Sequence, residues 1–132
     1  DIVFISLRDL EKEEKSLIEK YGIKVIKTSE LRRKGPESIV KSVVRYLSDC
    51  TDIYVSFDVD CLDAGITKGT GTPVENGLRE REAEDLMSKF MQIPKICCFE
   101  ITEVNPTLDR ENLMAEIAFN ILQRSVNILM LH

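Results

Sequence analysis

The chain has 132 residues, which is enough for one ordinary domain with its own hydrophobic core, and we expect a single domain over residues 1–132. No apolar run approaches the length of about 18 residues that a membrane-spanning helix needs, which argues against a membrane protein. A net charge of −5, without a basic stripe, argues against nucleic acid as a partner.

Apolar runs typical of strands alternate with helical patterns along the chain. In chain order, the patterns predict a strand at 2–6, a helix at 11–21 that stops at Gly22, a strand at 23–26, a helix that begins at Pro36, a strand at 53–57, a helix at 79–91, a strand at 96–99, a helix at 113–122 and a short strand at 128–131. Strands separated by helices in this way predict right-handed crossovers. The expected fold class is therefore α/β, a three-layer α/β/α parallel sheet with helices on both faces.

Two stretches between these elements have few structural signals. The basic run at 32–34 is interpreted as a solvated loop before Gly35 and Pro36. The longest irregular stretch is 60–78, and a loop of that length inside a compact domain usually has a function.

Four cysteines occur, at positions 50, 61, 97 and 98, without metal-binding or disulfide-framework spacing. We interpret them as reduced thiols, which are typical of cytoplasmic proteins, and we expect a cytoplasmic location. Cys97 and Cys98 are neighbours in a predicted strand, so they face opposite sides and are expected to act as small packing residues.

Acidic side chains follow two predicted strands near the point where each strand ends. Asp58 and Asp60 come after the apolar run at 53–57, and Glu103 comes after the strand at 96–99. Because side chains alternate along a strand, the two aspartates are expected to share one face. Like charges that close raise each other's pKa unless a cation lies between them. Carboxylate oxygens suit Mn²⁺, Mg²⁺ or Ca²⁺, so the sequence predicts a metal site at this edge of the sheet.

A different interpretation of the same aspartates remains open. Carboxylates directly after strands often cap loop amides or the start of the next helix. On that interpretation, Asp58 and Asp60 would stabilise local structure without binding a metal.

Several motifs, in this order and at this spacing, resemble the manganese-dependent ureohydrolases, a family that includes arginase, agmatinase and formiminoglutamase. The motifs are S-F-D-V-D at 56–60, L-D at 62–63, G-T-G-T-P at 69–73, G-L at 77–78, R-E at 81–82 and E-V-N-P at 103–106. The match covers nearly the whole chain but only the C-terminal part of such an enzyme, and Asn105 makes it closest to arginase. It implies an arginase-like fold that is incomplete at its N-terminal side. The first residue, Asp1, agrees with a chain that is part of something longer.

The resemblance implies a role for each site residue. Asp58 and Asp60 would be catalytic residues that bind two Mn²⁺ ions, Glu103 would bind the guanidinium group of the substrate, and Thr72 would line the same cleft. Two metal ions about 3.5 Å apart can share a bridging water and lower its pKa, so that hydroxide attacks the guanidino carbon. For arginine, the products would be ornithine and urea.

The departures from the family pattern limit what this chain can do alone. The other metal ligands of the family come from upstream Gly-Asp-His and Asp-Ala-His-x-Asp motifs, and neither occurs in this sequence. The single histidine, His132, cannot replace them. At most half of a dinuclear site remains, so we predict that the isolated chain is inactive and binds Mn²⁺ weakly.

Arg81 and Glu82 match an Arg-Glu pair that contributes to subunit contacts in arginases. The resemblance implies a homo-oligomer, a trimer or a hexamer, for the parent enzyme. The alternative is a local role near the start of a helix, where an acidic side chain is favourable by about 0.3 to 1 kcal/mol.

Three other functions remain open. Agmatinase or formiminoglutamase activity would be the same reaction class on another substrate. A signalling receiver domain would also place an acidic Mg²⁺ site at strand ends, but its acid pair would follow the first strand rather than the third. A non-catalytic scaffold would assemble with an active partner and do no chemistry.

Overall fold

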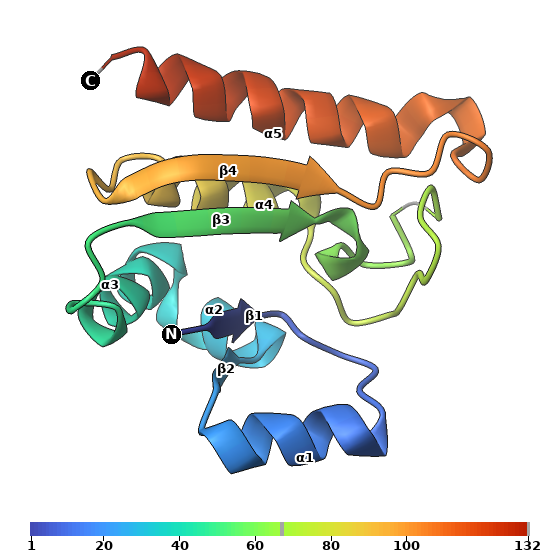
Figure 1. Ribbon diagram of the computed structural model, residues 1–132. Helices are drawn as coiled ribbons and strands as arrows, with labels where there is room; N and C mark the ends of the chain where they lie inside the picture. The colour runs from blue at the N-terminus through green and yellow to red at the C-terminus, as the bar shows by residue number, and fades with distance from the viewer. Residues whose placement is uncertain (67, 132) are drawn as a thin grey trace.

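The computed structural model describes residues 1–66 and 68–131, in which strands and helices alternate along the chain (Figure 1). In chain order, the elements are β1 (Val3–Ile5), α1 (Lys12–Tyr21), β2 (Lys24–Ile26), α2 (Thr28–Lys34), α3 (Pro36–Tyr46), β3 (Ile53–Asp58), η1 (Val59–Cys61), α4 (Glu80–Phe90), β4 (Ile96–Thr102), η2 (Arg110–Asn112) and α5 (Leu113–Leu129), where η denotes a short 3₁₀ turn. The predicted α/β class is confirmed. No helix in the described ranges is long and apolar enough to cross a membrane.

The four strands form two parallel pairs. β1 pairs with β2, and β3 pairs with β4, while no described ladder joins one pair to the other. In Figure 1, β1, β3 and β4 point the same way, so their carboxyl ends lie on one side of the molecule. The register of the second pair places Asp58 opposite Thr102. Two segments that follow these strands are therefore brought to the same rim.

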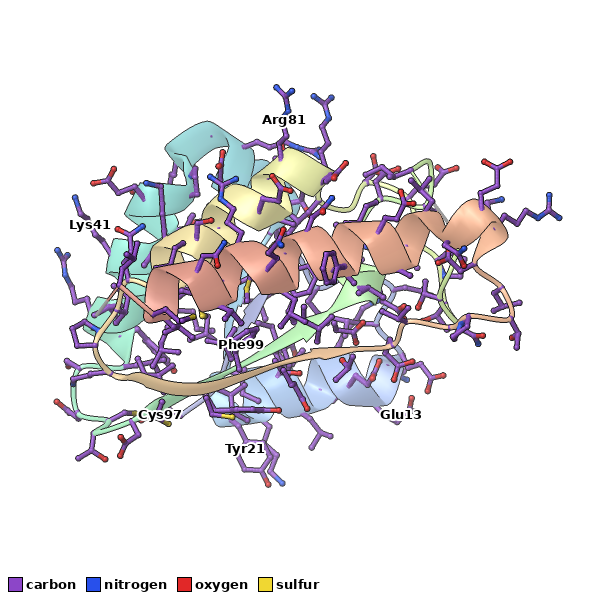
Figure 2. All side chains as sticks on the ribbon, turned by 90° about the horizontal axis from the view of Figure 1, so that it is seen from above. Glu13, Tyr21, Lys41, Arg81, Cys97 and Phe99 are labelled. Carbon is purple, nitrogen blue, oxygen red and sulfur yellow. The ribbon has the colours of Figure 1, made fainter. Side chains whose placement is uncertain are left out.

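The helices α2 to α5 form a row in which each packs against the next. Figure 1 shows α4 behind β3 and β4, and Figure 2, seen from above, shows α3 and α4 on that same side of β4. The β3 side chains that face this layer, Ile53 and Phe57, are buried, whereas Tyr54 and Ser56 on the other face are exposed. Parallel strands are usually covered on both faces, so the β3–β4 pair has one of its two covering layers.

The helix ends follow their sequence signals. The carboxylate of Glu14 accepts a hydrogen bond from the Glu11 backbone N–H at 2.8 Å, which satisfies a donor at the start of α1. Gly22 ends that helix in the left-handed conformation, with φ of 60°, which glycine adopts without a steric penalty. The predicted stop at Gly22 and the predicted start at Pro36 are both confirmed.

Two predicted segments differ from the structure. The basic run at 32–34 is the last turn of α2 rather than a loop, because Thr28 and Leu31 of the same helix are buried in the core. The predicted strand at 128–131 is wrong, because α5 continues to Leu129 and keeps Ile128 packed against the core. A short apolar run at the end of a helical pattern cannot be assigned by periodicity alone.

The predicted packing role of Cys97 and Cys98 is also wrong, since both side chains are exposed. The β3–β4 register is irregular at this point: Ile53 is opposite Ile96, and the next residue, Tyr54, is opposite Cys98. The irregularity interrupts the alternation of faces on which the prediction depended.

Candidate functional site

Asp58 and Glu103 lie at the carboxyl ends of two hydrogen-bonded strands. β3 ends at Asp58, its partner in the register is Thr102, and Glu103 is the next residue of the chain. Burial, and then the charges of Asp60 and Glu103, raise the pKa of Asp58 above its usual value, while a hydrogen bond from the Asp60 amide opposes the rise. The charges of the other two predicted acids therefore act on Asp58 at this rim.

Asp60 reaches the site by a turn and not by strand alternation, so that part of the reasoning from sequence is wrong. The strand ends at Asp58, and Val59–Cys61 forms the 3₁₀ turn η1. The Asp60 backbone N–H donates to Oδ1 of Asp58 at 2.8 Å. The capping alternative is thus realised at Asp58 through Oδ1.

Two threonines hold the carboxylate of Asp60. The Thr70 hydroxyl donates to Oδ1 and the Thr72 hydroxyl donates to Oδ2. Thr72 is exposed, whereas Thr70 has only 2% of its surface exposed. The sequence reasoning named Thr72 and missed Thr70, although the Gly-Thr-Gly-Thr repeat places both hydroxyls two residues apart and could have indicated it.

The loop between β3 and α4 closes on itself through backbone contacts. Asp63 N–H donates to the Leu78 carbonyl at 2.9 Å, and Leu78 N–H donates to the Cys61 carbonyl at 2.8 Å. The Asp63 carboxylate accepts from the Gly65 and Gly77 amides, and these bonds hold the pKa of Asp63 below its usual range. The described parts of this loop, 60–66 and 68–78, are therefore tied together at the rim.

The segment after β4 is joined to the Gly-Thr-Gly-Thr loop. Asn105 N–H donates to the Gly69 carbonyl at 2.9 Å, which brings the E-V-N-P motif beside the threonines. Glu103 itself has φ of 66°, a left-handed conformation that costs a residue with a Cβ roughly 1–2 kcal/mol. Such backbone strain is concentrated at functional sites, because surrounding structure must maintain it.

Arg8 is a further residue of the site that sequence reasoning missed. It follows β1, and its guanidinium donates to the carbonyls of Asp60 at 2.6 Å, Cys61 at 3.1 Å, and Leu62 and Val74 at 3.3 Å each. Hydrogen bonds to a charged group contribute about 1.5–3 kcal/mol each, which outweighs the cost of about 1–3 kcal/mol for the buried Arg8 Nε, a donor without an acceptor among the described residues. Sequence spacing carries no signal for such a contact, since it joins residues more than 50 positions apart.

The donor set fits a hard divalent cation in kind but not in number. Asp58 and Asp60 offer carboxylate oxygens, the ligands that Mn²⁺ and Mg²⁺ prefer. Within residues 1–66 and 68–131, however, no group of three or more acidic, histidine or cysteine side chains is arranged to hold a metal ion. His132 lies outside the described residues. The chain thus presents two carboxylates that could hold a metal together with ligands from elsewhere.

Glu82 has a partner within its own chain. The Arg32 guanidinium binds its carboxylate with Nε–Oε1 at 2.8 Å and Nη2–Oε2 at 3.0 Å. Arg81 is exposed and points away from the body of the molecule at the start of α4 (Figure 2). Among the described residues, the Arg81 side chain has no hydrogen-bond or ion-pair partner, in contrast to Glu82.

The sequence is similar to known proteins over most of its length. A family model described as Arginase family matches residues 1–126. The chain belongs to the Arginase family. An arginase of Brevibacillus brevis is 35% identical over 119 residues, a match that covers 89% of this chain and 40% of that protein. An arginase of Bacillus caldovelox is 36% identical over 118 residues, with coverage of 89% and 40%.

Solved structures of the family show the same fold. An arginase from Bacillus subtilis has a TM-score of 0.86 at 32% identity, over 94% of this chain and 42% of that one. A formimidoylglutamase from the same species has a TM-score of 0.88 at 24% identity, which shows the shared fold alone. The predicted ureohydrolase resemblance is confirmed, and the chain spans about two fifths of the length of the relatives it matches.

Proposed function

We propose that this chain supplies one part of the active site of a metal-dependent hydrolase that acts on a guanidino compound, with arginine as the substrate. The observation that supports this most is the meeting of Asp58, Asp60 and Glu103 at the carboxyl ends of β3 and β4 in a member of the Arginase family. Hydrolysis would release urea and leave ornithine.

Each site residue has a role that its surroundings suit. Asp58 and Asp60 would bind Mn²⁺, since both offer oxygen ligands and the threonine hydroxyls keep the Asp60 carboxylate in place. Glu103 would pair with the guanidinium of the substrate, because a carboxylate can accept two parallel N–H bonds from that group. Thr72 would line the same cleft. A bound metal would supply a water of lowered pKa as the nucleophile.

A complete site needs ligands from another polypeptide segment. The chain covers 40% of the Brevibacillus relative, and its described residues contain no group of three or more side chains arranged to hold a metal ion. β1 and β3 also belong to separate pairs and have unpaired edges, to which further strands could add. We propose that the remainder of the enzyme completes both the sheet and the metal site, in a homo-oligomeric and cytoplasmic protein.

Complementation in trans tests this proposal. The chain is mixed with a polypeptide that carries the missing family segments, Mn²⁺ is added, and urea release is measured with arginine and, separately, agmatine. Activity on arginine from the mixture, and none from either part alone, supports the proposal. The Asp58→Asn and Glu103→Gln variants should each abolish the recovered activity, and recovery that survives both substitutions would contradict the assigned roles.

A non-catalytic scaffold is the second candidate. It is favoured by the absence of a complete metal-binding group in the described part of the chain. A scaffold would form a stable complex with the complementary polypeptide, but the complex would release no urea from any guanidino compound. An Arg81→Ala variant would then weaken assembly if Arg81 contributes to subunit contacts. The receiver alternative has no support from the family comparison and is not proposed.

A further inference from the structure

Arg8 connects β1 to the loop that carries the acidic residues. Nη1 donates to the Cys61 carbonyl, and Nη2 donates to the carbonyls of Asp60, Leu62 and Val74. The first three carbonyls belong to the outgoing limb of the loop, and the fourth belongs to its returning limb. One guanidinium therefore holds the two limbs together.

The local structure explains why the carbonyls converge on one cation. Residues 59–61 form the 3₁₀ turn η1, and Leu62 is its C-cap, so successive carbonyls near the end of the turn point toward a common region. A guanidinium presents its donors in a planar fork that can serve acceptors in two directions. A lysine ammonium is a compact charge without that fork, so it cannot reproduce the same set of contacts.

Arg8 is itself held in place from the N-terminal side. Its Nη1 also donates to the Ser6 carbonyl at 2.7 Å, and the Ser6 hydroxyl forms a buried hydrogen bond with Thr28 at 2.7 Å. Ser6 N–H donates to the Ile26 carbonyl at 2.8 Å. The guanidinium thus anchors the acidic loop to the β1–β2 pair, with which β3 shares no described ladder.

We propose that Arg8 is a positioning residue of the site, which orders the parts of the loop at 60–66 and 68–78 and thereby holds the Asp60 carboxylate toward Asp58. Arg8 acts through the loop carbonyls and does not contact the substrate. The effect of an ordered loop on catalysis rests on the function proposed above. The order of the loop itself can be measured without metal or substrate.

Amide hydrogen exchange in the full 132-residue chain tests the proposal. The variants are Arg8→Lys, which keeps the charge, and Arg8→Ala, with Arg45→Gln as a control at an exposed arginine near the end of α3. We expect amides of the 60–78 loop to exchange roughly tenfold faster in both Arg8 variants, with little change in β3 and β4 and none in the control. Millimolar guanidinium should restore protection to Arg8→Ala, whereas an equal concentration of tetramethylammonium should not.

Two results would overturn the proposal. Faster exchange throughout the chain in both Arg8 variants would assign Arg8 a general role in stability. Unchanged exchange in the loop would show that the contacts of Arg8 do not order the loop. Line broadening of the Asp58 and Asp60 amides by Mn²⁺ is measured on the unsubstituted chain in parallel. Its absence would count against the proposed metal site and leave the exchange result on Arg8 intact.

Discussion

Asp58 is unfavourable for the stability of the metal-free chain at neutral pH. Its carboxylate is partly withdrawn from water and lies near two other acids, which raises its pKa. A carboxyl group whose folded pKa exceeds its unfolded value destabilises the fold when it ionises. The unfavourable contribution of Asp58 to the stability of the metal-free chain should therefore diminish as the pH falls toward 3.8, the usual value for aspartate.

Asp58→Asn should stabilise the metal-free chain at neutral pH. The amide oxygen can still accept the Asp60 N–H bond, while the charge repulsion disappears. After allowance for solvent screening, the expected gain is on the order of 0.5 kcal/mol, measured by urea unfolding at pH 7. The gain should shrink at pH 4. The control is Asp49→Asn, in the exposed turn after α3, which should show neither a gain in stability at pH 7 nor a change in that gain at pH 4. A loss of stability at neutral pH would contradict the repulsion argument.

Gly77 is required by close packing of backbone against backbone. A Cβ at this position would lie 2.5 Å from the Leu62 carbonyl carbon and oxygen and 2.6 Å from the Asp63 nitrogen. We expect Gly77→Ala to lower the free energy of unfolding by about 1–3 kcal/mol. Gly71→Ala is the matched control, because nothing lies within 4 Å of its added Cβ, and its effect should stay within about 0.5 kcal/mol. Equal effects of the two substitutions would refute the packing argument.

At the scale of elements, the Arg32–Glu82 pair joins α2 to the start of α4. Arg32 also donates to the Gly77 carbonyl at 2.9 Å, so the same side chain holds the end of the acidic loop. The hydrogen bonds from Arg32 hold the pKa of Glu82 below its usual value of 4.5. Because the folded pKa is depressed, the pair stabilises the fold at neutral pH and loses that contribution as the pH falls below about 4.5.

A double-mutant cycle with Arg32→Gln and Glu82→Gln measures this coupling. We expect about 1 kcal/mol at pH 7 from a two-pronged and partly buried pair, and clearly less at pH 3. The Lys41–Glu37 pair is the control: its N–O distance is 2.7 Å, but both side chains are mostly exposed. Its coupling should be at most about 0.5 kcal/mol. Similar values for the two pairs would show that the geometry of the first confers no advantage.

At the scale of the whole molecule, apolar surface remains on α5 beside the core. Phe119, Leu122, Val126 and Leu129 recur at intervals of three and four residues, and each has at least 38% of its surface exposed. These four side chains form the α5 stripe, an exposed apolar row on a helix whose other side is buried in the core. It agrees with a chain that spans about two fifths of the length of its relatives.

The isolated chain should therefore associate with itself at high concentration. Leu122→Lys combined with Val126→Lys should shift the sedimentation profile toward monomer and leave helical circular dichroism unchanged. Gln123→Lys with Asn127→Lys adds the same charge to the polar face of α5 and should have a smaller effect. Equal shifts in the two double variants would show that the added charge, and not the loss of the α5 stripe, reduces association.

The alternation of strands and helices, the stop at Gly22 and the acids after β3 and β4 followed from the sequence by itself. These features depend on periodicity, capping and motif order, which act between residues close in the chain. The family resemblance also needed only the order and spacing of the motifs. Metal and substrate roles for Asp58, Asp60, Glu103 and Thr72 remain predictions.

Only the tertiary structure decided how these pieces are joined. It placed Asp60 on a turn rather than on the strand, paired Glu82 with Arg32, and brought the Arg8 guanidinium to four carbonyls of the loop. It also divided the strands into two pairs and extended α5 through the predicted last strand. Each of these outcomes depends on which distant groups become neighbours during packing, and a linear pattern of residue types does not contain that information.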